Sequence, residues 1–177
     1  MDQFPIYLCH LSCLVPSKSL VHEGCYALKA WRQYPNARNA WLDNWEYYNS
    51  FGQAYFDAIV DNLSRVRDLP FFRWHVAGDI PSPDYLNGMA YVAKALPNTR
   101  FLAFTKNGTL DVSSLPDNLV IRYSYWPNYK PLVNSTFLNF AGLTIDERLS
   151  GYVCKGNCRH CCKCWSRVCK TVVFNKH

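Results

Sequence analysis

A short cysteine-rich stretch near the end of the chain constrains the fold more than any other feature. Between Cys154 and Cys169 it carries six of the nine cysteines within sixteen residues. Core packing does not call for so local a concentration of thiols. The spacing C-x3-C-x2-C-x2-C, which begins at Cys154, lets four thiolates from one loop reach one metal centre. The sequence therefore predicts a metal-binding segment.

The spacing of the cysteines also bears on the choice of metal. Zinc ribbons usually present two C-x2-C pairs separated by a dozen or more residues, whereas compact triplets resemble the ligation of ferredoxin clusters. We therefore expect a [4Fe-4S] cluster, with zinc as the alternative. The preferred ligands are Cys154, Cys158, Cys161 and Cys164. Cys162 and Cys169 are expected outside this set, although Cys169 could replace Cys154.

Three further cysteines lie near the start of the chain, at Cys9, Cys13 and Cys25. They stand among turn-forming residues, which predicts an irregular loop with a short strand at 4–8. These thiols could form a second metal site, donate ligands to the first one, or be buried as small apolar side chains. All three alternatives stay open.

Length and cysteine usage indicate one domain in a reducing compartment. The 177 residues suffice for a single core, which we divide into a cysteine-containing loop (1–35), an α/β core (36–150) and a metal-binding tail (151–177). No apolar run approaches the roughly 20 residues that span a bilayer, and no secretory signal is evident. Thiols stay reduced in the cytoplasm, so we expect a cytoplasmic protein that binds metal and does not associate with membranes.

The net charge of +6 is concentrated in the tail, because residues 152–177 contain six Lys or Arg and no acidic residue. One explanation is binding to nucleic acid or a nucleotide, with Arg159, Trp165, Arg167 and Lys170 as the contact patch. The other is electrostatic compensation, since four thiolates around Zn²⁺ or a [4Fe-4S]²⁺ cluster leave about two negative charges. Both explanations can hold together.

The middle of the chain predicts an α/β fold. Aromatic and apolar residues at spacings of three and four indicate helices at about 36–49 and 51–67, separated at Gly52. A strand–helix–strand pattern follows, and it predicts a sheet with parallel pairing and a right-handed crossover. A small partial (β/α) barrel, the alternative to an open sheet, is what the family resemblance given below implies. The expected strands are 71–79, 100–106, 119–124 and 170–174, and the expected helix is 81–95, with Ser82 as its N-cap. Residues 125–151 are expected to form a loop with a brief helical turn at 146–149.

Three polar residues are candidates for chemistry at the sheet edge. His75, Asp79 and Lys106 lie at or near the carboxyl ends of predicted parallel strands, where ligands collect. His75 and Asp79 are four residues apart and share one side of an extended strand. Simpler explanations are a hydrogen-bonded core histidine and an aspartate that caps the following helix.

Several motifs together resemble a known family. They are Gly24–Ala27, His75–Asp79, Phe101–Lys106, Gly156–Trp165, Val173–Phe174 and His177. Their order is similar to that of the bacteriophage gene product eighty-eight family, whose pattern resembles a reduced radical-SAM-type α/β barrel. The resemblance implies a phage protein acting in the host cell cytoplasm, a partial parallel barrel and iron–sulfur chemistry.

Three classes of function are consistent with these features. The first is a radical-SAM-like iron–sulfur enzyme acting on a small molecule or nucleotide. The second is a non-catalytic protein that binds nucleic acid or a host protein and uses an iron–sulfur or zinc centre to fold its tail. The third is a structural zinc domain.

Overall fold

The computed structural model describes residues 27–75, 78–125, 138–141 and 151–174. Within these ranges the helices and strands follow one another as α1 (Ala27–Gln33), α2 (Pro35–Phe51), α3 (Gln53–Ser64), β1 (Phe71–Arg73), α4 (Pro83–Ala95), β2 (Arg100–Thr105), β3 (Leu119–Tyr125), β4 (Leu138–Ala141), β5 (Tyr152–Val153), α5 (Cys158–Cys161), the 3-10 turn η3 (Lys163–Trp165) and β6 (Thr171–Phe174). The α/β class predicted from the sequence is confirmed.

The strands form one open parallel sheet. Its order is β1-β2-β3-β4-β6-β5, and every described pair is parallel. Leu102 of β2 pairs with Val120 of β3, which sets the register at the centre of the sheet. Because β1 and β5 are its two edges, the described sheet does not close into a barrel. Of the two predicted architectures, the open sheet is the one observed.

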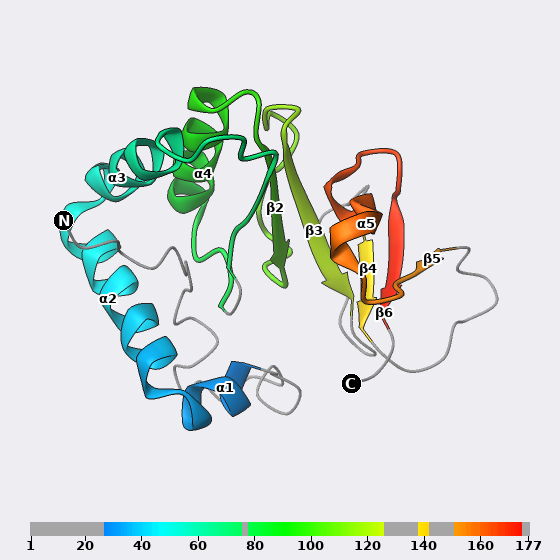
Figure 1. Ribbon diagram of the computed structural model, residues 1–177, viewed down its shortest axis with the longest axis horizontal. Helices are drawn as coiled ribbons and strands as arrows, with labels where there is room; N and C mark the ends of the chain where they lie inside the picture. Colours follow the sequence, from blue (N-terminus) through cyan, green and yellow to red (C-terminus); the bar gives the residue numbers. More distant parts are fainter. Residues whose placement is uncertain (1–26, 76–77, 126–137, 142–150, 175–177) are drawn as a thin grey trace.

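Helices α3 and α4 lie beside the β2–β3 end of this sheet, with α4 between α3 and β2, whereas β4, β6 and β5 lie at the other end (Figure 1). Alternate residues of the central strands project toward them, including Phe101 and Ala103 of β2 and Ile121 and Tyr123 of β3, all of which are buried. Side chains in a strand alternate between the two faces, so this pattern defines the helical layer. The main apolar core therefore lies between α3, α4 and the β2–β3 pair.

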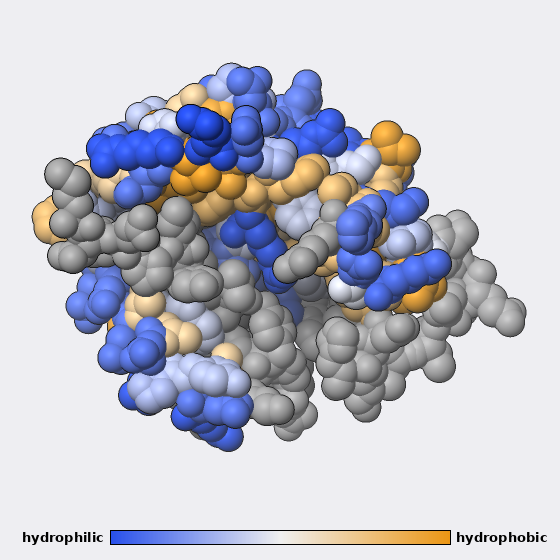
Figure 2. Space-filling model, in the orientation of Figure 1, coloured by the Kyte–Doolittle hydropathy of each residue, from blue (hydrophilic) through white to orange (hydrophobic). Residues whose placement is uncertain are grey.

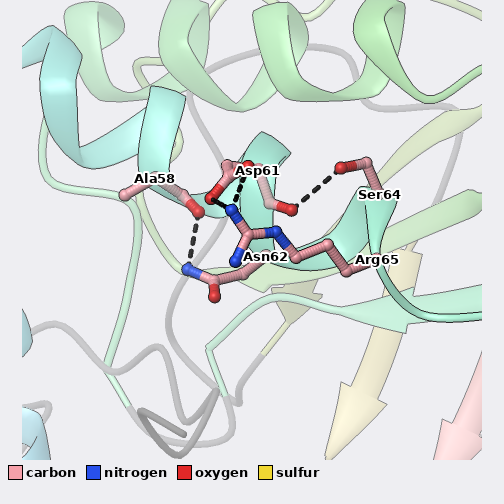
Figure 3. A network of polar contacts seen from close by, with 5 residues as sticks. All are labelled: Ala58, Asp61, Asn62, Ser64 and Arg65. Atoms are coloured by element: carbon pink, nitrogen blue, oxygen red, sulfur yellow. Dashed lines mark hydrogen bonds and ion pairs between the residues drawn. The ribbon is translucent and has the colours of Figure 1, made fainter. Parts of the chain in front are cut away.

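Helices α2 and α3 are separated as the sequence predicts. Gly52 has φ +52, a left-handed conformation that glycine adopts without steric cost, and it ends α2 and begins α3. Helix α3 ends in a polar network in which Arg65 donates to both carboxylate oxygens of Asp61 at 2.8 and 2.6 Å, while Asn62 donates to the Ala58 carbonyl and Ser64 to the Asp61 carbonyl (Figure 3).

Both ends of α4 carry side-chain caps. The Ser82 hydroxyl accepts a hydrogen bond from the Tyr85 N–H at 3.2 Å, and this confirms Ser82 as the predicted N-cap. At the other end, the Asn118 side-chain amide donates to the carbonyls of Ala93 and Leu96, and also to that of Thr99. Carbonyls at a helix C-terminus have no partner within the helix, so Asn118 supplies donors that α4 lacks.

The first predicted strand, 71–79, is shorter in the structure, where β1 covers only Phe71–Arg73. His75 and Gly78 have φ +50 and +96, which is incompatible with an extended strand. Five elements were missed altogether, and three of them, β5, α5 and η3, lie in the tail. Helix α1 lies within the predicted loop at 1–35, and β4 lies within the predicted loop at 125–151. The predicted strand at 4–8 and helical turn at 146–149 fall outside the described residues.

The described surface is mixed in character. Hydrophilic side chains are spread around it, with apolar ones exposed in smaller areas between them (Figure 2). Among the described residues, no helix combines the length and apolar character required to cross a bilayer.

Candidate metal centre

The cysteine-rich segment is the connection between β5 and β6, which are adjacent parallel strands. It runs from Cys154 to Lys170 and contains α5 and η3. Cys162 joins the two with φ +47, a left-handed conformation that reverses the chain after a single helical turn. The η3 turn contacts β2 and β3, so the segment covers the sheet face opposite α3 and α4 (Figure 1).

A buried arginine fastens this segment to the sheet. Arg122 follows Ile121 in β3 and therefore projects to the face away from the helices, where its side chain is 0% exposed. Its Nε donates to the Cys164 carbonyl at 2.9 Å, and its terminal nitrogens donate to the carbonyls of Lys163, Cys169 and Lys170. One guanidinium therefore binds backbone carbonyls at both ends of residues 163–170, the second half of the loop.

Two further contacts anchor the same segment. The ring of Trp165 lies 5.4 Å from that of Phe71, and its indole nitrogen donates to the Phe72 carbonyl at 3.5 Å. The Arg167 guanidinium donates to the Pro116 carbonyl at 2.9 Å and forms an ion pair of 3.2 Å with the Asp117 carboxylate. The tail is thus packed against β1 and against the turn before β3.

The six described cysteines of the segment carry free thiols. Cys164 is half-buried, and burial raises its pKa to about 11. The nearby Arg122 guanidinium lowers this pKa, whereas negative charge on Cys154, Cys158 and Cys161 raises it. The charges of the other three predicted ligands therefore act on Cys164, and a bound cation would offset their effect on its pKa.

Hydrogen-bond donors already face two of these sulfurs. The Gly156 N–H donates to Cys154 Sγ at 3.4 Å, and the φ of +74 at Gly156 produces the turn that allows it. The Lys163 N–H lowers the pKa of Cys161, as does the Tyr152 hydroxyl, which lies 3.6 Å from Cys161 Sγ. Donors of this kind stabilise thiolates in preference to thiols.

The donor set fits a thiolate-ligated centre in its chemistry, but the described sulfurs do not converge on one point. Within the described ranges, no group of three or more His, Cys, Asp or Glu side chains is arranged to hold a metal ion. Cys154 directly follows β5, and its N–H donates to the Val173 carbonyl at 2.7 Å, whereas Cys158 is exposed at the start of α5. This geometry does not discriminate between an iron–sulfur cluster and a zinc ion.

Cys169, the predicted alternative ligand, is also near this loop. Its Sγ lies 3.6 Å from the Thr171 carbonyl, and its charge acts on the phenol of Tyr152. The remaining alternative ligands, Cys9, Cys13 and Cys25, lie outside the described residues. Their role stays a prediction.

The predicted catalytic residue His75 is buried in the helical layer. Its Nε2 lies 3.2 Å from the Tyr85 hydroxyl, which lies 3.2 Å from the hydroxyl of Tyr55. Trp74 and His75 are 0% and 2% exposed. These contacts fit the simpler expectation of a hydrogen-bonded core histidine.

Asp79 and Lys106 meet at the carboxyl end of β2. The Asp79 carboxylate accepts hydrogen bonds from the N–H groups of Ile80 and Lys106, each at 2.7 Å, and from the Thr105 hydroxyl. Burial raises the pKa of Asp79, and these donors oppose the shift. The described contacts of Asp79 tie the loop after β1 to the end of β2 and do not include His75. A shared catalytic role for the three residues stays untested.

The predicted nucleic-acid contact patch is partly engaged inside the molecule. Trp165 and Arg167 make the anchoring contacts described above, although Arg167, like Lys170, is exposed. The side chain of Arg159 is outside the described part of the structure. Part of the patch therefore also serves as an internal anchor.

Sequence reasoning missed Arg122, which donates hydrogen bonds to four backbone carbonyls of the loop. Its signal was a charged residue at the centre of the apolar strand sequence Leu119–Tyr125. A charge in such a position is almost never fully buried unless it has partners, so the pattern indicates a specific set of acceptors on one sheet face.

Fold and loop together define an α/β protein with an open parallel sheet and a cysteine-rich crossover. Comparison with known families places residues 7–148 in the family described as Gene product 88. Because the match covers more than half of the chain, the protein belongs to this family. The predicted phage gene-product family is confirmed, whereas the radical-SAM-type resemblance receives no support from the match.

The match ends before Cys154, so the cysteine-rich segment and the tail motifs lie beyond the matched residues. No curated protein matches the chain. No solved structure matches it either. Evidence about the segment therefore comes from its own residues.

Proposed function

We propose that this phage protein binds a metal centre through Cys154, Cys158, Cys161 and Cys164, and that the centre is a [4Fe-4S] cluster. The observation that carries the proposal is that all four cysteines lie in the one connection between β5 and β6, at the spacing C-x3-C-x2-C-x2-C. Cysteine spacing favours iron–sulfur, and zinc is the alternative occupant. Either would supply a positive centre that the four thiolates share.

The four ligands would come from three parts of the loop. Cys154 follows β5, Cys158 and Cys161 lie at the two ends of α5, and Cys164 lies in η3. Residues three apart on a helix share one side, so α5 can present Cys158 and Cys161 together. Cys164 is the fixed member, because its carbonyl accepts from Arg122.

The surroundings of the loop also suit an anionic centre. Four thiolates exceed the charge of the metal by about two units, and burying that excess requires compensation. Arg122 lies beneath the loop, and the Lys163 ammonium lies 4.4 Å from the ring of Tyr152. The basic, acid-free composition of the segment supports the same reading.

The most direct role for such a centre is to fold the crossover between β5 and β6 as a structural element. Structural metals contribute their binding free energy to folding in this way. The enzymatic possibility, an iron–sulfur protein acting on a small molecule or nucleotide in the host cytoplasm, rests on the sequence resemblance. The contacts of His75 and Asp79 are accounted for by packing and hydrogen bonding.

Binding of nucleic acid or a host protein is the second candidate. It is favoured by the exposed side chains of Lys155, Lys163 and Lys170, which lie on one acid-free segment. Nucleic-acid binding through these residues should weaken as salt rises, because phosphate contacts release counterions. Retention of full affinity at high salt would oppose a nucleic-acid partner.

Adjacent cysteines provide a matched test of the metal site. Cys161→Ala removes a proposed ligand, whereas Cys162→Ala removes a neighbouring thiol that is not one. We expect the first variant, purified anaerobically, to lose most of its bound metal and the second to keep it. Equal metal content in both variants would overturn the ligand assignment.

A further inference from the structure

We propose that Arg122 is a positioning residue that docks the cysteine-rich segment on the sheet before any metal is bound. The inference deepens the proposed function, because it concerns how the same loop is prepared for its ligand. Its experimental test is independent, since it is carried out on metal-free protein.

Arg122 binds two separate parts of the segment. Arg122 donates to Lys163 and Cys164, which lie in η3, and to Cys169 and Lys170, which directly precede β6. Its acceptors are backbone carbonyls, so the contacts do not depend on the state of any thiol. One side chain therefore joins the two ends of the second half of the loop.

The Arg122 side chain is also buried. The guanidinium is fully covered, and a charge without partners in that position would destabilise the fold strongly. Undocking the segment would remove all of the described carbonyl acceptors of Arg122 at once. Docking of the loop and satisfaction of the buried charge are consequently one event.

The other described contacts that anchor the cysteine-rich segment also do not depend on metal. Trp165 packs on Phe71, and Arg167 binds the Pro116 carbonyl and the Asp117 carboxylate. Zinc-finger peptides are unfolded without metal because nothing else holds their ligands. Here the second half of the loop is held by the sheet, so only its outer part, with α5, is left for the metal to order.

Cysteine alkylation measures this docking directly. Metal-free protein is prepared with a chelator and a reductant, then treated with iodoacetamide, and the labelling rate of each cysteine is read by peptide mass spectrometry. Wild type is compared with Arg122→Met and Arg122→Lys. Arg65→Lys is the matched control, because Arg65 is exposed and pairs with Asp61 on α3.

In the metal-free wild type, Cys164 should react at least about tenfold more slowly than the exposed Cys158, which reports local protection. Arg122→Met should raise the rate at Cys164 about tenfold or more, since hydrogen bonds from a charged donor are lost. Arg122→Lys should give an intermediate rate, because lysine keeps the charge but not the forked donor geometry. Arg65→Lys should match wild type.

Hydrogen exchange separates docking from global stability. If Arg122 acts locally, exchange accelerates at 151–174 in Arg122→Met and stays slow in α4 and β2. Equal labelling of Cys164 and Cys158 in metal-free wild type would overturn the inference, even if the protein binds metal. Protection of Cys164 in a protein that takes up no metal would leave the inference standing and defeat the proposed function. If Arg122→Met fails to fold, Arg122→Lys and the wild-type comparison carry the test.

Discussion

At the scale of single residues, Arg122 is a charged side chain buried in an apolar strand, and it needs hydrogen-bond acceptors from another part of the chain. A charged group in the centre of a sheet is costly, but its carbonyl acceptors recover part of the lost hydration. The acceptors lie in a segment more than forty positions away in sequence. A strand pattern can reveal the unusual arginine but not its partners.

Tyr123, the neighbour of Arg122, provides a prediction on pH dependence. Burial raises the pKa of Tyr123 to about 12, and the charges of Asp111 and Asp79 add to the shift. An unfolded tyrosine ionises near pH 10, so between about pH 10 and 12 the unfolded state releases a proton that the folded state keeps. The free energy of unfolding should therefore fall over this window, by up to about 2–3 kcal/mol from this residue.

Tyr123→Phe isolates that contribution. The variant should lose about 1–3 kcal/mol at neutral pH, because the buried Leu110 carbonyl loses the hydroxyl donor that now lies 2.7 Å away. Relative to wild type, its stability should decline less between pH 10 and 12, as measured by urea unfolding. Parallel pH curves for the two proteins would contradict the assignment.

At the scale of secondary-structure elements, Asn118 joins the end of α4 to the start of β3. Its amide donates to three carbonyls at 2.8–3.1 Å. Asn118→Asp should cost more stability than Asn118→Ala, since a carboxylate would face carbonyl oxygens at the negative end of a helix. We expect losses of about 1–3 kcal/mol for Ala and more for Asp, measured by urea unfolding. At pH 3, where the carboxyl is neutral, the two variants should approach each other. A gap that persists at that pH would contradict this explanation.

The contact between α3 and α4 depends on Gly88. A Cβ at this position would overlap the ring of Phe56, which is buried in the main core. Gly88→Ala should therefore destabilise the protein by about 1–3 kcal/mol despite the better helix propensity of alanine.

A second substitution tests whether the steric overlap is the cause. Phe56→Leu in the Gly88→Ala background should cost less than Phe56→Leu alone, because the smaller side chain relieves the overlap. Additive losses in this double-mutant cycle would show that the two positions are not coupled.

At the scale of the whole molecule, the sequence predicted the parallel sheet well because strand and helix periodicities are local. Gly52, Ser82 and the apolar runs of β2 and β3 mark their elements directly. The first strand was predicted too long, because the positive φ of His75, which is not extended, depends on tertiary context. Strand β4 is four residues long and is paired on both sides, so its formation depends on β3 and β6.

The candidate site was predictable in part for the same reason. Cysteine spacing is local, and it marked the four thiols that the structure places in one loop. The role of Trp165 and Arg167 as internal anchors was not predictable, because their partners Phe71 and Pro116 are remote in sequence. Basic and aromatic residues in such a tail resemble a nucleic-acid patch until their contacts are known.

The content of iron, acid-labile sulfide and zinc in the anaerobically purified wild-type protein shows whether these four cysteines bind a metal centre. The account predicts about four irons and four sulfides per chain, as a cysteine-ligated cubane requires. About one zinc per chain would support the same four cysteine ligands, with a zinc ion in place of the iron–sulfur cluster. Protein that contains no stoichiometric metal, and whose Cys154, Cys158, Cys161 and Cys164 are all alkylated without denaturation, would contradict the account.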